Sequence, residues 1–191
     1  MKRQLLIITA MAAGLSGNAQ QIDFNLAGRQ ASQVTENGFI PWAIATTRYD
    51  SLLLQDRGIT VKMALDDSAT GMTMKSCWWK DGVNKFSKLI SDGVTVYRLD
   101  ANGNTTMIRS GAVKMIVTIS GLSAGKHTLL AYHNDTDGNS PAKLDVYANG
   151  TKVQTGVKQS SRATNIDDCG MSYIEFNAEE GKDVTIWYVT T

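Results

Sequence analysis

Aromatic rings beside charged side chains are the feature of this sequence with the clearest capacity to recognise a ligand. Trp78 and Trp79 are adjacent and are followed directly by Lys80 and Asp81. Exposed indole rings stack on the CH-rich faces of sugars, and an arginine guanidinium binds a carboxylate through two hydrogen bonds. The residues that this pattern assigns to a carbohydrate site are Trp42, Arg48, Tyr49, Trp78, Trp79, Lys80 and Asp81. The alternative for each indole is packing in or beside the core, which is the role we expect for Trp187.

A polar loop after His133 supplies further hydrogen-bonding groups. His133, Asn134 and Asp135 lie where a predicted strand ends, and binding residues collect in such loops on a rigid sandwich. The alternative is a histidine satisfied by its own loop. Asp135, Asp137 and Asn139 carry the oxygen donors that a hard cation prefers, without the terminal glutamate of an EF-hand loop. The loop therefore either holds a structural calcium ion or forms an ordinary Asx turn, and no cofactor is expected to be required.

Motifs for catalysis are weak in this sequence. It contains no GxSxG segment, and its two histidines exclude a site with several histidine ligands. Tyr132, His133 and Arg48 would be a chemically permissible base, acid and neutralising group for a lyase. We therefore expect a protein that is not an enzyme, with a small polysaccharide lyase or glycosidase as the alternative.

The two cysteines, Cys77 and Cys169, allow two interpretations. In an oxidising compartment they could form a disulfide, or they could be two buried, inert thiols. Neither belongs to a CxxC pair, which argues against a redox or zinc role.

Alternation of apolar and polar residues predicts the elements that must position these side chains. It runs through segments 22–26, 59–65, 113–119, 126–133, 142–148, 174–176 and 184–188. Strands that bury one face are typical of antiparallel sheets, so the pattern predicts an all-β, two-sheet antiparallel sandwich of the jelly-roll type. Asn149-Gly150 predicts a hairpin turn, and Asp92-Gly93 the start of another strand. Residues 83–90 alone look helical, and residues 28–58 are either a functional loop or contain short strands.

The N-terminus has the pattern of an export signal. Lys2 and Arg3 precede an apolar run over residues 5–13, and small residues precede a predicted cleavage after Ala19. The alternative is a buried first element. We expect residues 1–19 to be the signal and residues 20–191 to be one domain, exported to the periplasm or beyond. A net charge of +1 and no lysine or arginine cluster argue against nucleic acid as a partner, and no apolar run is long enough to insert into a membrane.

Several segments resemble galactose-binding-like and malectin-like sandwiches. These are residues 22–25, 121–130, 132–135 and 144–150. The chain is similar in particular to the N-terminal non-catalytic domains of secreted bacterial enzymes that degrade polysaccharides. The resemblance implies a carbohydrate-binding or scaffolding role, with ligand contacts in loops at one end of the sandwich. The partner is then a polysaccharide or oligosaccharide, and the further alternative is an accessory domain that packs against a catalytic module or partner protein.

Overall fold

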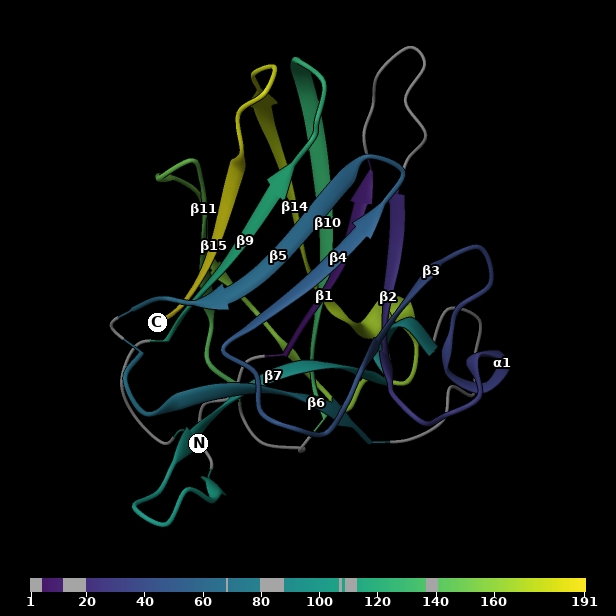
Figure 1. Ribbon diagram of the computed structural model, residues 1–191, viewed down its shortest axis with the longest axis vertical. Helices are drawn as coiled ribbons and strands as arrows, with labels where there is room; N and C mark the ends of the chain where they lie inside the picture. The colour runs from purple at the N-terminus through teal and green to yellow at the C-terminus, as the bar shows by residue number, and fades with distance from the viewer. Residues whose placement is uncertain are drawn as a thin grey trace.

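Two β-sheets packed face to face make up the protein (Figure 1). The computed structural model describes residues 5–11, 20–67, 69–79, 88–106, 108, 113–136 and 141–191, and for residues 5–11 it describes the backbone alone. In Figure 1, β4, β5 and β9 cross in front of β1, β10 and β14, and β6 and β7 run across the lower part of the molecule. This arrangement confirms the predicted all-β sandwich.

The first sheet has six strands and is antiparallel throughout. Its order is β12-β11-β15-β9-β5-β4. The strands are β4 (Ser51–Asp56), β5 (Ile59–Leu65), β9 (Lys114–Ser120), β11 (Leu144–Ala148), β12 (Thr151–Val157) and β15 (Val184–Thr190). Burial alternates strictly along β9 and β15, as expected for strands that present one face to the core.

The second sheet has nine strands and is mixed. The strands are β1 (Leu5–Met11), β2 (Gln20–Leu26), β3 (Ile40–Ile44), β6 (Met72–Trp78), β7 (Asp92–Leu99), β8 (Thr105–Thr106), β10 (Gly125–Asp135), β13 (Ser160–Ser161) and β14 (Gly170–Ala178). Two pairs, β2 with β3 and β10 with β13, are parallel, which the antiparallel pattern did not predict. The longest pairing joins β10 to β14 over nine residues of each strand.

The core fills the space between the sheets with alternating inward side chains. Phe24, Met63 and Tyr188 are among its largest fully buried members. Complete burial of a side chain of this size stabilises the folded state by roughly 1.5–3 kcal/mol. The apolar residues that alternate along the predicted strands supply most of this core, so the sequence pattern identifies the core residues.

Two turns require the residues that the sequence places there. Asn149 and Gly150 connect β11 to β12 with φ of 46° and 80°, as a tight hairpin turn demands. A Cβ atom on Gly121 would lie 2.1 Å from the carbonyl oxygen of Gly58, so only glycine fits where these loops cross.

The irregular segments resolve into short elements. Residues 28–58 contain α1 (Ala31–Val34), β3 and β4. The predicted alternative in which this segment contains short strands is therefore the one that the structure supports. Of the predicted helix over residues 83–90, the 3₁₀ turn η1 (Lys88–Ile90) is seen, and residues 80–87 lie outside the described part of the chain.

The predicted export signal overlaps a strand of the second sheet. β1 pairs with β10, β2 and β7. Removal of residues 1–19 after export stays a prediction, and so does the domain boundary at Gln20. None of the helices in the described ranges has the length and hydropathy needed to cross a membrane.

Candidate functional site

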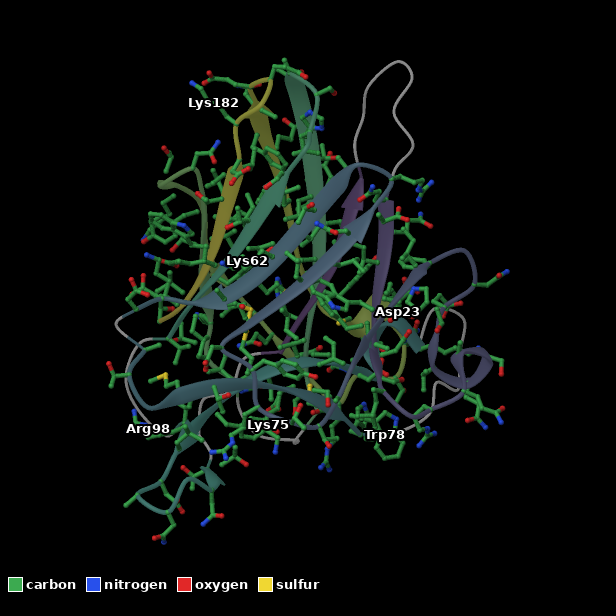
Figure 2. The ribbon with its side chains drawn as sticks, in the orientation of Figure 1. Asp23, Lys62, Lys75, Trp78, Arg98 and Lys182 are labelled. Atoms are coloured by element: carbon green, nitrogen blue, oxygen red, sulfur yellow. The ribbon has the colours of Figure 1, made fainter. Side chains whose placement is uncertain are left out.

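One exposed indole lies at the end of the second sheet. Trp78 is the last residue of β6 and is 37% exposed. The guanidinium carbon of Arg29, from the turn after β2, lies 4.9 Å from the centroid of its ring. A cation over an indole face at this distance is an attractive interaction. Figure 2 shows Trp78 at the lower edge of the molecule.

A second indole–guanidinium pair lies beside the first in the sequence. Trp79 is half-buried, and its backbone N–H donates to the carbonyl of Ser91. The guanidinium carbon of Arg162 lies 5.6 Å from the Trp79 ring centroid, and Arg162 Nε donates to the carbonyl of Thr136 at 3.0 Å. Arg162 has a φ of 53°, a left-handed conformation that is uncommon for a residue other than glycine. We call Arg29, Trp78, Trp79 and Arg162 the indole rim.

Two buried carboxyl groups lie on β2 and β7, the strands next to the indole rim. Asp92 pairs with Trp78 across β6 and β7, and its Oδ2 accepts the N–H of Leu26 at 3.0 Å. Asp23 Oδ2 accepts the N–H of Glu36 at 2.6 Å. Within the described residues, the Oδ1 atoms of Asp23 and Asp92 have no hydrogen-bond partner.

The same two carboxyl groups have strongly perturbed acidities. Burial raises the pKa of Asp23 to about 7; the hydrogen bond from the Glu36 N–H opposes this rise, and the charge of Glu36 adds to it. Burial raises the pKa of Asp92 to about 8, with a second contribution from the charge of Asp23. Near neutral pH the pair therefore holds at least part of a proton, as two close carboxyl groups in a dry site must.

Several residues that the sequence assigned to the site lie in the interior. Trp42 is buried and stacks on Phe24 with ring centroids 5.0 Å apart, so its ring faces the core rather than a ligand. His133 is fully buried, with Nε2 2.9 Å from Ser172 Oγ and its ring edge-on to Tyr188. The inward phase of the alternation explains both positions.

Asn134 and Asp135 are also buried, and Asn134 is a structural link. Its Nδ2 donates to the carbonyls of Ile90 and Ala163, and its Oδ1 accepts from Ser160 Oγ and from the N–H of Ala163. It therefore ties β10 to the chain around η1 and β13. This loop carries Arg162, so Asn134 positions the indole rim without contacting a ligand.

The other predicted residues are dispersed. The Tyr49 hydroxyl accepts the N–H of Ala45, and Arg48 Nη1 donates to the carbonyl of Gly103 at 2.7 Å. Lys80, Asp81, Asp137 and Asn139 lie outside the described residues. Within the described ranges, no three histidine, cysteine or acidic side chains gather as a metal site would require.

The cysteines and the lyase trio have no reactive arrangement. Cys77 and Cys169 are buried thiols rather than a disulfide. Burial raises the pKa of Cys169 to about 11, so it is a protonated thiol near neutral pH. His133 is sealed in the core while Arg48 is exposed, so the base, acid and neutralising group do not meet at an accessible surface.

A groove on the outer face of the second sheet was not predicted from the sequence. It has a volume of about 510 Å³. Its described lining residues are Gln21, Asn37, Phe39, Leu89, Leu130, Tyr132, Ile166, Asp167, Cys169 and Met171. A signal was present in residues 170–174, where apolar side chains occupy both phases of the alternation, with Met171 and Tyr173 on the outward phase.

A second hollow lies at the opposite end of the sandwich, around the β11–β12 turn. Its volume is about 520 Å³, and it is lined in part by Trp187. Lys114 lies 4.0 Å from the centroid of that indole, and Tyr147 packs beside it. The polar groups of the hollow bind one another, as Lys182 pairs with Glu179 and Asn149 Oδ1 accepts the N–H of Thr185.

Comparisons with known proteins found only distant structural similarity. No family model matches the chain, and no curated protein matches it. Among solved structures, the GH31 α-xylosidase from Xanthomonas citri aligns with 73% of this chain, at 13% sequence identity and a TM-score of 0.28. The chain spans 16% of the length of that enzyme.

Proposed function

We propose that this protein is an exported, non-catalytic carbohydrate-binding module of the galactose-binding-like type, and that it recognises an acidic polysaccharide at the indole rim. The observation that carries the proposal is the exposed ring of Trp78 with the Arg29 guanidinium beside it. An accessible indole offers a flat apolar face for stacking, and a sugar ring offers the matching flat CH surface.

The charges of the indole rim select the class of sugar. Arg29 and Arg162 each bring a guanidinium close to an indole. A guanidinium binds a planar carboxylate through two parallel hydrogen bonds, which a neutral sugar cannot offer. The proposed ligand is therefore a polymer that contains uronic acids, with one sugar stacked on Trp78 and a carboxylate held by arginine.

Affinity for one short chain is expected to be weak, because a single stacked ring contributes about 0.5–1.5 kcal/mol beyond its buried area. Electrophoresis through gels that contain polygalacturonate or alginate, beside gels with a neutral glucan, is a suitable assay. We expect retardation in the acidic gels, and its loss in Trp78→Ala.

The matched control is Trp187→Ala, which removes an indole at the other end of the sandwich. Thermal unfolding of both variants checks that each is folded. Retardation that survives in Trp78→Ala but disappears in Trp187→Ala would move the site to the opposite hollow and contradict the proposal.

The absence of catalysis belongs to the same proposal. Incubation with uronate polysaccharides should release no unsaturated sugars, because the trio that a lyase would need does not meet at the surface. Appearance of unsaturated products from the purified protein would replace the binding proposal with the lyase alternative.

A further inference from the structure

Strand β1 occupies a position in the second sheet that the exported protein would leave open. It lies between β10 and β2 and is antiparallel to both (Figure 1). Its partners are Thr128–Tyr132 on β10 and Gln20 and Gln21 on β2. The predicted cleavage after Ala19 removes β1 but leaves β2 whole, because β2 begins at Gln20. We call the resulting gap between Thr128–Tyr132 and the start of β2 the strand slot.

The strand slot has a preformed backbone edge. β10 keeps its other neighbour after cleavage, because β14 pairs with it over nine residues. Along an antiparallel strand the backbone groups of successive residues point to opposite sides, so alternate residues among 128–132 direct N–H and C=O into the slot. Val94 and Thr95 of β7 extend the edge, since they also pair with β1. An unpaired row of such groups is a template for another extended chain.

The strand slot is one strand wide. Neighbouring strands in a sheet lie about 4.8 Å apart, and one strand separates β10 from β2. β2 keeps β3 as its other neighbour, just as β10 keeps β14. The paired edge of another sheet is too wide for this space. The ligand that matches the slot is a single extended peptide segment.

The residues that border the strand slot are uncharged, and those beneath it are apolar. Leu129 and Ala131 alternate inward on β10, and with Val94 of β7 each is at most 1% exposed. None of the residues that pair with β1 carries a charge at neutral pH. A charged side chain placed inward here would lose its water without gaining a partner. A segment that enters must therefore direct uncharged, apolar side chains toward the core at every second position.

We propose that the strand slot of the exported protein binds an extended segment of a partner polypeptide, antiparallel to β10. The segment spans at least the five residues of the β10 register and alternates apolar side chains toward the core. Backbone hydrogen bonds supply affinity and the inward side chains supply selectivity, as in other sheets that gain a strand from a peptide. The inference rests on the export and cleavage in the proposed function, but it concerns a surface apart from the indole rim. It gives the module a means of attachment to a second polypeptide.

The test compares the exported protein with a full-length chain that keeps residues 1–19. The probe is a synthetic peptide with the sequence of residues 4–12, extended by lysines for solubility. Its matched control carries Ile8→Pro, because proline removes a backbone donor and disrupts strand pairing. We expect the probe to raise the melting temperature of the exported protein by about 5 °C. The control peptide should have no effect, and neither peptide should act on the full-length chain, whose slot is filled.

Hydrogen exchange locates the bound probe. The amides among residues 128–132 that face the strand slot should exchange on the order of tenfold more slowly when the probe is bound. Protection of these amides in the exported protein alone, with no effect of the probe, would show that the gap closes within the chain and would overturn the proposal. Equal stabilisation by the proline control would overturn it too, because strand pairing would then not explain binding.

Two further outcomes separate the strand slot from the proposed function. N-terminal sequencing that finds residues 1–19 retained in the exported protein overturns the slot, because β1 then fills it. Gel retardation by acidic polysaccharide, measured on the same samples, reports on the indole rim alone. Its loss with the probe still bound would remove the rim as a sugar site and support the slot independently.

Discussion

Trp78 and Asp92 lie opposite one another across β6 and β7, with the indole 37% exposed and the carboxyl group 1% exposed. The exposed ring belongs to the surface that we propose binds sugar. The buried carboxyl group holds the backbone of Leu26, three residues before the Arg29 that faces the ring. One cross-strand pair therefore supplies both the exposed ring of the indole rim and a buried carboxyl group that holds the chain before Arg29.

This relationship makes stability depend on pH through Asp92. Its pKa in the folded protein, about 8, lies above its ordinary value of 3.8, so the folded state binds more protons than the unfolded state between these values. The contribution of Asp92 to stability is then greatest below about pH 4 and is lost as pH rises to about 8. Asp92→Asn replaces the ionisable group with an amide that stays neutral at every pH, so we expect its melting temperature at pH 8 to exceed that of the wild type by ~5 °C.

Differential scanning fluorimetry at pH 5 and pH 8 checks this expectation. The difference between Asp92→Asn and the wild type should be smaller at pH 5, where the wild-type pair is already protonated. Asp50→Asn, an exposed carboxylate replaced in the same way, should show no such change with pH. A variant that is destabilised equally at both pH values would show that Asp92 is not protonated in the fold.

Asn134 should prove to be a structural residue rather than a binding residue. Asn134→Ala removes four hydrogen bonds from a buried position and leaves buried partners unsatisfied. We expect the free energy of unfolding to fall by on the order of 3 kcal/mol. Urea unfolding measures it, and Asn102→Ala in an exposed loop is the matched control, with little expected change. A folded Asn134→Ala of wild-type stability that fails to bind glycan would contradict this assignment.

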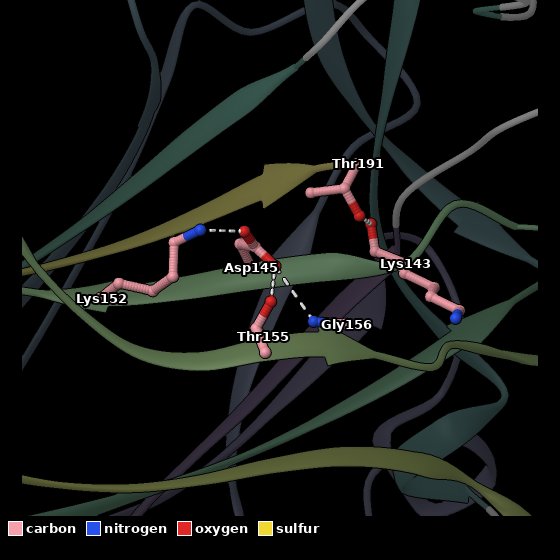
Figure 3. Close-up of polar contacts among 6 residues, drawn as sticks. All are labelled: Lys143, Asp145, Lys152, Thr155, Gly156 and Thr191. Atoms are coloured by element: carbon pink, nitrogen blue, oxygen red, sulfur yellow. Dashed lines mark hydrogen bonds and ion pairs between the residues drawn. The ribbon is translucent and has the colours of Figure 1, made fainter.

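Asp145 should stabilise the irregular edge strand β12. Figure 3 shows its carboxylate accepting hydrogen bonds from Lys152 Nζ, Thr155 Oγ1 and the N–H of Gly156, beside the register shifts between β11 and β12. The hydrogen bond from Lys152, followed by those from Thr155 and Gly156, lowers the pKa of Asp145 to about 2. Its contribution to stability is therefore complete above pH 4 and is lost as pH falls through about 2.

Chemical unfolding of Asp145→Asn at several pH values tests this role. The variant should be less stable than the wild type at pH 7, and the difference should shrink as the pH approaches 2. Asp168→Asn, on an exposed turn, should track the wild type throughout. A difference that stays constant down to pH 2 would mean that the charge of Asp145 contributes nothing.

The N-terminal segment leads to a prediction about the exported protein. If residues 1–19 are removed, Thr128–Tyr132 of β10 lose the strand that pairs with them on one side, while β14 still pairs with them on the other. N-terminal sequencing of the exported protein should read Gln20 first. Hydrogen exchange at those residues of 128–132 whose N–H groups bonded to β1 should then be faster than in a chain that retains β1, because these groups face solvent. Equal protection in the two forms would show that another segment takes the place of β1.

Much of the fold could be predicted from the sequence because alternation reports burial directly. Residues 59–65 form β5 as predicted, and Asn149-Gly150 makes the expected hairpin. The parallel pairing of β2 with β3 could not be predicted, because the order of strands in a sheet depends on distant segments. The same holds for β4 and β3, short strands within a polar segment whose alternation is broken by turns.

The candidate site was harder to predict because residue type does not state exposure. Trp42 and Trp78 are the same residue type, yet one stacks on Phe24 in the core and the other lies at the surface. The position of a residue in the alternation of its strand decides whether its side chain faces the core or the solvent. This position could be predicted only where the strand itself had been recognised. Arg29 and Arg162 were missed because they are distant in sequence from the indoles that they face.

The most direct test of the account is a calorimetric titration of the protein with an oligogalacturonide and with its fully methyl-esterified form. The two ligands have the same rings, and the ester removes the carboxylate charge that Arg29 and Arg162 are proposed to bind. We predict measurable binding of the acid and binding of the ester weaker by roughly tenfold, since a hydrogen bond to a charged group contributes about 1.5–3 kcal/mol. Equal affinities for the two, or no binding of either, would contradict acidic-sugar recognition at the indole rim.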